Sequence, residues 1–188
     1  ALIIGSENII SALFGYGSLD ENAVHNTAKA LYYFALGLPA FSLIKIFSTF
    51  FFANHNTKIP FYISLVSVIL NIVISIYYFN KIGFIIIPIA TTISSWFNGL
   101  LLFIFLKNEN LFNFSKIFFV KLIKIIIASI AMGIFFNLLL TSFQDQLSFN
   151  NNIKSFYLII IVILCLLFYL LVSYFIKAFQ ISDIKLKY

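Results

Sequence analysis

Lys45 is the only charged residue in an apolar stretch, LGLPAFSLIKIFSTFFF, that covers residues 36–52. A lysine at the centre of a bilayer costs about 2.5 to 3.5 kcal/mol on insertion scales. At a rise of 1.5 Å per residue, a helix that ends about eight residues later holds Lys45 about 12 Å inside the membrane boundary. We expect its ammonium group to face a hydrated cavity and attract an anionic ligand. The alternative is that Lys45 snorkels to the membrane surface.

Polar residues recur along one side of three successive apolar segments, at about residues 27–52, 60–79 and 83–106. Their three- and four-residue spacing places each set on one face of a helix. We therefore expect three neighbouring helices to border a hydrated cavity, although small polar residues also pack membrane helices together. The cavity candidates are Lys45, Ser42, Ser48, Thr49, Asn71, Ser95 and Asn98.

Few other residues could carry chemistry. Cys165 is the only cysteine, so it can neither form a disulfide within the chain nor build a metal site alone, and we expect a small packing residue. His25 and His55 are expected to be solvated. The sequence has no phosphate-binding loop, no Cys/His metal spacing and no Ser/His/Asp set, and Glu109 and Asp145 are expected in loops. These features favour a transporter over an enzyme, with no metal or cofactor.

The composition places these residues in a membrane. Hydrophobic residues make up 62% of the chain and charged residues 10%, and apolar runs of about 20 residues recur. Strands of a membrane barrel would alternate polar and apolar residues, and that pattern is missing. We predict an all-α, polytopic transmembrane helical bundle. It comprises the end of one helix near Phe14, a glycine-rich turn, and five full helices over about 27–52, 60–79, 83–106, 117–141 and 155–176.

Prolines and the first residues refine this plan. Pro39 and Pro88 lie within predicted helices and are expected to kink them. Pro60 lies in a first turn, where the missing N–H would have no helical partner. The opening residues, ALIIGSENII, read as the end of an apolar segment already in progress, so we expect the chain to be a C-terminal fragment.

The lysines predict the orientation in the membrane, because the sequence has no arginine. Counting alternate connections and the C-terminal tail as one side gives eight lysines, against Lys81 and Lys154 on the other. By the positive-inside rule the side with eight is cytoplasmic. The net charge of +6 thus reflects topology rather than nucleic-acid binding, and the basic loop and tail are expected to touch anionic lipids. The eight are Lys58, Lys107, Lys116, Lys121, Lys124, Lys177, Lys185 and Lys187.

Three stretches of the sequence resemble one family. The run YFALGLPAFSLIKIFSTFFFANHNTKIPFYISLVSVILNIVIS resembles the MurJ/MviN family of lipid II flippases, which carries a G-L-P-A-F helix, an intramembrane lysine and an A-R-Q-D-T-K-T-P loop. GFIIIPIATTISSWFNGLLL is similar to the family helix G-L-A-L-A-T-S-L-S-A-W-L-N-A-L-L-L, and LFGYGSLDENAV resembles the turn after its L-F-x-R-G motif. The likeness covers about residues 9–106.

The resemblance implies a 14-helix transporter of the multidrug/oligosaccharidyl-lipid/polysaccharide exporter superfamily. Such a protein flips an undecaprenyl-linked peptidoglycan precursor across the bacterial inner membrane by alternating access. Residues 1–106 would be second-lobe helices, and residues 107–188 the final helix pair and a cytoplasmic tail. The N-terminal lobe of the same protein would be the partner of this chain. The last two helices would border a lipid-tail groove, for which the candidates are Gly133, Asn137, Leu166 and Tyr169.

Departures from the family pattern leave alternatives open. Tyr16 stands where the family often has arginine. The charged A-R-Q-D loop of the family appears here as Ala53, Asn54, His55 and Asn56. A polysaccharide-lipid flippase or a drug/cation antiporter would share the helical plan, and an antiporter would be expected to carry membrane carboxylates. A membrane polyprenyl glycosyltransferase could also bind a lipid-linked substrate, but would need an acidic catalytic residue near a membrane face.

Overall fold

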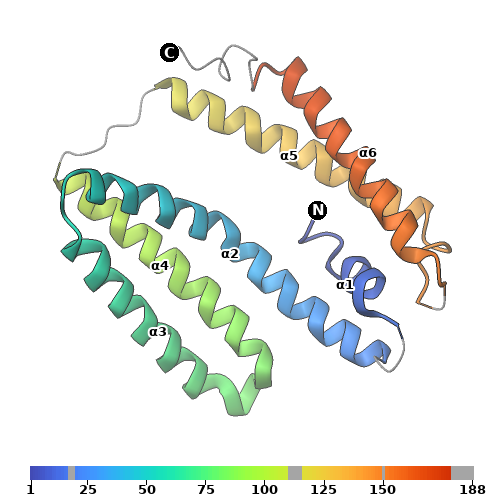
Figure 1. Ribbon diagram of the computed structural model, residues 1–188, viewed down its shortest axis with the longest axis horizontal. Coiled ribbons are helices and arrows are strands. Elements are labelled where there is room, and N and C mark those ends of the chain that lie inside the picture. Colours follow the sequence, from blue (N-terminus) through green and yellow to red (C-terminus); the bar gives the residue numbers. More distant parts are fainter. Residues whose placement is uncertain (17–19, 110–115, 150, 179–188) are drawn as a thin grey trace. The chain divides into compact units, whose positions relative to one another are not determined.

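The computed structural model describes residues 1–16, 20–109, 116–149 and 151–178. These residues form six α-helices and one short 3-10 helix, without a β-strand (Figure 1). The predicted all-α architecture is confirmed, with one short helix followed by five long ones. In chain order they are α1 (Ser6–Phe14), α2 (Glu21–Ala53), α3 (Lys58–Ile82), η1 (Gly83–Ile85), α4 (Ile86–Asn108), α5 (Lys116–Ser142) and α6 (Lys154–Phe175).

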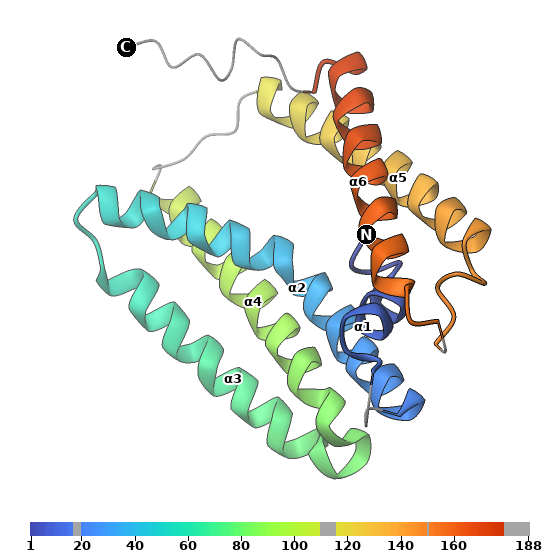
Figure 2. The ribbon, with the colours of Figure 1, turned by 45° about the vertical axis from the view of Figure 1, so that its right-hand side comes forward.

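Four apolar stretches of the described chain are long enough to cross a membrane. One of them, Lys58–Asn108, contains both α3 and α4, which turn back and lie side by side in Figures 1 and 2. With 25 and 23 residues, each of these two helices is about 35 Å long or more, enough to cross alone. Large apolar side chains on the spans are exposed, as lipid-facing residues are; Ile76 is 71% exposed.

The chain forms two compact units. The first contains α1, α5, α6 and the first turn of α2, and the second contains the rest of α2 with α3 and α4. Our sequence-based boundary grouped α1 with α2 to α4 as second-lobe helices. In the structure α1 packs against α6 within the first unit. The assignment of residues 1–106 and 107–188 to parts of a larger transporter stays a prediction.

The second unit is held by an apolar cluster near one end and by small residues along α2 and α4. Gly99 of α4 lies close to α2: a Cβ atom there would be 3.9 Å from the Ala40 carbonyl oxygen and 3.8 Å from Ile44. Such close backbone approach gives van der Waals contact between membrane helices, which gain little from apolar burial. The buried cluster consists of Phe47, Phe51, Ile63, Leu102 and Leu106.

The first unit has an aliphatic and aromatic core. The rings of Phe135 and Phe168 stack between α5 and α6, with centroids 4.3 Å apart. Cys165 is buried in this core and is confirmed as a packing residue. The buried members come from α1, α5, the following loop and α6; they are Ala12, Phe136, Leu140, Leu147, Leu158, Ile161 and Cys165.

Among the helix ends, the start of α2 differs most from the sequence prediction. α2 begins at Glu21 rather than near residue 27, because the Asp20 carboxylate accepts a hydrogen bond from the Ala23 N–H at 2.8 Å and caps the helix. At the other end of α2, His55 has φ of 56°, and the His55 and Asn56 N–H groups bond back to Phe52 and Phe51. This is a Schellman ending, so the exposed His55 has a structural role in the loop.

One of the two prolines predicted within helices lies closer to a helix start than expected. Pro39 lies within α2, as predicted, and its expected kink stays a prediction. Pro88 is the third residue of α4, nearer the start of its helix than expected, and its kink also stays a prediction. In the first turn a proline removes no intrahelical bond. Gly83, with φ of 72°, makes the turn between α3 and α4.

Candidate functional site

A polar cavity of about 400 Å³ lies between α2, α3 and α4 in the second unit. Of the predicted cavity residues, Asn71, Ser95 and Asn98 line it, and Lys45, Ser42, Ser48 and Thr49 do not. α3 and α4 contribute all of its polar side chains, while α2 contributes two apolar side chains. The lining residues are Phe41, Ile44, Ser64, Ser67, Val68, Asn71, Ile72, Thr91, Ser94, Ser95 and Asn98.

Asn71 is at the centre of the hydrogen bonds in this cavity. Its Nδ2 donates to Thr91 Oγ1 at 3.1 Å and to Ser94 Oγ at 3.2 Å, so the amide joins α3 to α4. Its Oδ1 accepts a hydrogen bond of 3.5 Å from Ser75. The hydroxyls of Thr91 and Ser94 in turn donate to carbonyls of α4. Each of these polar groups therefore has a partner inside the protein, as membrane depth requires.

Asn98 differs from its neighbours. Its side chain is 7% exposed, and Oδ1 has no hydrogen-bond partner among the described residues. A buried amide oxygen without a partner costs about 1 to 3 kcal/mol. Because Asn98 lines the cavity, that oxygen is available to a water molecule or to a polar ligand that enters. Among the described residues that line the cavity, this is the one buried side-chain oxygen or nitrogen without a partner.

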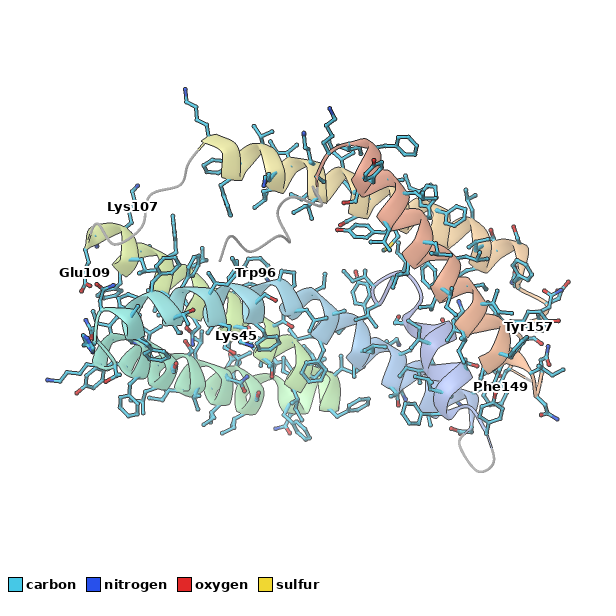
Figure 3. All side chains as sticks on the ribbon, turned by 45° about the horizontal axis from the view of Figure 1, so that its top comes forward. Lys45, Trp96, Lys107, Glu109, Phe149 and Tyr157 are labelled. Carbon is cyan, nitrogen blue, oxygen red and sulfur yellow. The ribbon has the colours of Figure 1, made fainter. Side chains whose placement is uncertain are left out.

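The wall between α2 and α4 is fixed by side chains of α4. Thr92 Oγ1 donates to the Tyr33 carbonyl at 2.7 Å, and Trp96 Nε1 donates to the Leu36 carbonyl at 3.1 Å. Gly37 permits this approach, because a Cβ atom there would lie 3.0 Å from Thr92 Oγ1. The two bonds hold the part of α2 that precedes Pro39 against α4, with Trp96 labelled in Figure 3.

Lys45 is exposed on α2 (Figure 3). No described residue forms an ion pair or hydrogen bond with its ammonium group. Ser42 and Thr49 were predicted on the same face, and both bond to their own helix. The Ser42 hydroxyl donates to the Leu38 carbonyl, and the Thr49 hydroxyl donates to the carbonyls of Lys45 and Ile46. Ser48 is half-buried. The polar stripe of α2 is thus separate from the polar cavity, and its cation is free to meet a ligand or water.

A second groove, of about 840 Å³, runs along α5 in the first unit. Two lipid-tail candidates, Gly133 and Asn137, line it. The other two candidates, Leu166 and Tyr169, lie on α6 and do not line the groove. Leu166 is exposed, and Tyr169 is half-buried. Aliphatic side chains dominate this α5 groove, which is lined by Ala1, Ile3, Ile4, Ile126, Ser129, Ile130, Met132, Gly133, Ile134 and Asn137.

Lys154 is the functional candidate that sequence reasoning missed. It was counted with the loop lysines, but its side chain is 1% exposed and lies among α1, α6 and the loop before α6. No signal in the sequence pointed to this, because Lys154 lies just before the helix predicted over 155–176, and its partner Gly15 lies 139 residues away. For metal binding, no group of three or more His, Cys, Asp or Glu comes together in the described ranges.

The sequence of the chain matches the family model described as lipid II flippase MurJ over residues 1–157. The chain belongs to the MurJ family of lipid II flippases. Over 179 aligned residues it is 31% identical to the probable lipid II flippase MurJ of Thermotoga maritima. The aligned region covers 95% of this chain and 34% of that protein. The corresponding protein of Rickettsia prowazekii is 40% identical over 101 residues, 53% of this chain and 20% of that protein.

A solved structure gives the same result for the fold of this MurJ family member. The lipid II flippase MurJ in its inward closed conformation superposes with a TM-score of 0.73 and 27% sequence identity, covering 94% of this chain and 34% of that one. The chain therefore spans about a third of the length of that structure and of the Thermotoga relative. With its several apolar helices it is a multi-pass membrane protein.

Proposed function

We propose that the protein containing this chain flips lipid II, the undecaprenyl-diphosphate-linked peptidoglycan precursor, across the bacterial inner membrane by alternating access. The observation that carries the proposal is the match of residues 1–157 to the flippase family model. The solved MurJ neighbour supports it, because its likeness extends over both compact units of the chain. Flipping moves the precursor to the side where the cell wall is built.

In this proposal the chain is most of the C-terminal lobe of a 14-helix transporter. Residues 1–106 are second-lobe helices, and residues 107–188 are the last helix pair and its tail. The N-terminal lobe of the same protein is the partner that completes the substrate cavity. The exposed polar face of α2, with Lys45, is a suitable surface for that cavity because its cation has no partner among the described residues.

Lys45 attracts the diphosphate of the substrate. An ammonium group in a cavity of lowered dielectric interacts with such an anion more strongly than it does in water, although its own desolvation opposes part of the gain. The cost of placing a lysine about 12 Å from the end of α2 is offset when substrate binds. The α5 groove, with Gly133 and Asn137, offers aliphatic walls to part of the lipid tail.

We infer a transporter without catalytic activity or cofactor. Transport of this kind needs a shaped path and electrostatic attraction rather than a bond-breaking site. A cation antiporter or a glycosyltransferase would instead use acidic groups. Glu109 and Asp145 lie outside the helices, and Glu7 is an exposed residue of the short α1. Asp20 precedes α2 and Glu21 is its first residue. Among the described residues, these positions count against an antiporter, which would be expected to carry carboxylates deep in the membrane.

We further infer that the C-terminus and the loop after α4 are cytoplasmic. The eight-to-two distribution of lysines supports this orientation. Single cysteines placed at two exposed positions, Asn108 at the end of α4 and Asn152 in the turn before α6, give the test in the full-length protein with Cys165 replaced by alanine. A membrane-impermeant thiol reagent should label Asn152→Cys in intact cells and Asn108→Cys only after lysis. The opposite pattern refutes the orientation.

The function is tested with the full-length protein in a bacterial strain depleted of its own lipid II flippase. We expect the wild-type protein to restore growth, and lipid II to become accessible to an external enzyme that cleaves only outward-facing precursor. A strain depleted of a polysaccharide-lipid flippase serves as the control for substrate class. Growth rescue in the control strain alone, with no exposure of lipid II, would contradict the proposal and favour the polysaccharide alternative.

A further inference from the structure

Lys154 is a buried cation at the start of α6, and the partners found for it are carbonyls and rings rather than a carboxylate. Its Nζ donates to the Gly15 carbonyl at 2.7 Å and to the Phe149 carbonyl at 2.7 Å. The same atom lies 4.5 Å from the ring centroids of Tyr16 and Phe149, and Figure 3 labels Phe149 beside the start of α6. Two carbonyls and two ring faces replace water around the ammonium group.

Ser155, the next residue, makes a second link to α1. Its hydroxyl donates to the Ala12 carbonyl and lies 2.7 Å from the Tyr16 hydroxyl. A serine has one hydroxyl hydrogen, so once that hydrogen is given to Ala12 the Tyr16 hydroxyl must donate to Ser155. Ala12 and Gly15 belong to the end of α1, where carbonyls lack partners within the helix. Two adjacent residues of α6 therefore satisfy the end of α1.

The electrostatics explain why a lysine is used. A cation in the first turn of its own helix is opposed by the helix dipole, whereas a cation at the C-terminus of another helix is favoured. Lys154 is in the first turn of α6 and at the C-terminal end of α1. Its charge is thus unfavourable for α6 alone and favourable for the contact with α1. Separating the two helices would remove the Gly15 carbonyl and the Tyr16 ring from the ammonium group.

We propose that Lys154 and Ser155 are positioning residues that couple α1 to α6, so that these two helices move as one body during transport. We call the contact of Lys154 and Ser155 with Ala12, Gly15 and Tyr16 the α1–α6 clamp. The inference rests on the proposed function, because it specifies which helices keep their contact while the transporter changes state. Helix movements in alternating access then occur outside the clamp.

The first experiment measures the distance between α1 and α6 in the full-length protein. Spin labels are attached at Leu13→Cys and Phe156→Cys, which are 59% and 61% exposed next to the clamp, in a protein whose other cysteines are replaced. We expect one narrow distance distribution that is the same with and without lipid II. Lys154→Met, which keeps the stem and removes the charge, should broaden it, and Lys154→Arg should broaden it less.

A change of the distance in the wild-type background on addition of lipid II would overturn the proposal, because the helices would then move apart during the cycle. An unchanged distribution in Lys154→Met would overturn it as well. If Lys154→Met does not accumulate in the membrane, Tyr16→Phe replaces it. That variant removes only the hydroxyl that donates to Ser155, and it should broaden the distribution measurably.

The second experiment separates coupling from folding. At equal membrane levels, Lys154→Met should reduce flipping about tenfold, within the range by which single substitutions change coupling between sites. A cysteine pair, Ala12→Cys with Ser155→Cys, is then added to that variant. Oxidation should restore flipping and reduction should remove it again, because the disulfide replaces the clamp. Failure of a formed disulfide to restore flipping would refute the coupling role.

The two experiments also distinguish this inference from the proposed function. If the wild-type protein does not flip lipid II, the proposed function fails. The broadening caused by Lys154→Met without substrate still tests the clamp, since it does not depend on transport. A broad distribution in the wild-type protein itself would refute the clamp while leaving the flippase assignment untouched.

Discussion

The two compact units of this chain use polar side chains in different ways. In the unit of α2, α3 and α4, hydroxyl and amide groups line a cavity, and Asn71 joins α3 to α4 across it. In the unit of α1, α5 and α6, the helices meet through aliphatic and aromatic residues, and the buried cation Lys154 satisfies backbone carbonyls. The second unit gathers hydroxyl and amide groups around a cavity, whereas the first uses a buried cation to bond the end of α1 to α6.

This difference has a physical basis. Between helices in lipid, apolar burial brings little gain, so association depends on close packing and on hydrogen bonds. A cavity needs polar groups that retain spare capacity, as the Asn98 oxygen does. A rigid contact needs the reverse, with every donor engaged, and the Lys154 and Ser155 contacts approach that condition. We therefore expect substitutions in the two units to affect transport and stability differently.

The largest effect is expected for Lys45→Met, on activity. This substitution keeps the apolar stem and removes the charge that we propose for diphosphate attraction, so flipping at normal membrane levels should be lost. Lys45→Arg keeps the charge with altered geometry and should retain part of it. Because Lys45 is exposed and without a described partner, the thermal stability of Lys45→Met in detergent should change little. Full complementation by Lys45→Met would leave Lys45 a snorkelling residue.

A large effect on stability is expected for Gly15→Ala in the first unit. A Cβ atom there would lie 2.5 Å from the Ser11 carbonyl oxygen and 3.1 Å from the Phe149 ring. Backbone must move to admit it, which we expect to cost about 1 to 3 kcal/mol, the usual range for overpacking. Chemical unfolding in detergent measures this. The control is Gly99→Ala in α4, where the same atom meets only ordinary contacts at 3.8 Å or more.

Gly99→Ala should be neutral or stabilise by up to about 1 kcal/mol, because alanine has the higher helix propensity. Equal destabilisation by the two alanines would show that close helix approach in the second unit is as demanding as the turn that ends α1. The contrast between a tightly fixed unit and a more adaptable one would then not hold for the backbone.

How far the sequence predicted these features depends on the kind of interaction. The long helices followed from apolar runs and punctuation, and every one of them is present. Asn71, Ser95 and Asn98 were found because helical spacing fixes which residues share a face. The start of α2 was misplaced because a single side-chain cap at Asp20 extends the helix into a stretch that reads as a turn. Local sequence patterns determine where a helix forms, whereas a single capping residue can lengthen or shorten that helix by one or two turns.

Contacts between distant elements could not be predicted in this way. Lys154 lies 139 residues from Gly15 along the sequence, and nothing in either neighbourhood indicates the pairing. Similarly, α2 presents its polar stripe away from the cavity, because its contribution there comes from Phe41 and Ile44. The direction in which a helix face points depends on its neighbours. A sequence defines the face but not the partner it meets.

A moderate effect is expected for Asn71→Ala in the second unit. The substitution removes the bonds to Thr91 and Ser94 and should destabilise by about 0.6 to 1.7 kcal/mol, as for hydrogen bonds between helices in membranes. Ser64→Ala is the control, because Ser64 lines the same cavity without a described hydrogen bond. Thermal unfolding of the two variants in detergent gives the comparison. Equal stabilities would mean that Asn71 serves the cavity rather than the contact between α3 and α4.

The smallest effect is expected for Ser42→Ala and Thr49→Val on α2. Both hydroxyls donate to carbonyls of their own helix, and those carbonyls keep their backbone partners within α2 when the hydroxyl is removed. We therefore expect a change of at most about 0.5 kcal/mol in stability, as for substitutions that leave no group unpaired. Flipping should fall by no more than about twofold, since 0.4 kcal/mol corresponds to that factor. Lys45→Met, only a few residues away on the same helix, is the internal reference. Ser42→Ala could instead lose as much flipping as Lys45→Met without losing stability. That outcome would show that the whole polar stripe of α2 contacts the substrate path. The second unit would then offer the substrate two polar surfaces, the stripe and the cavity.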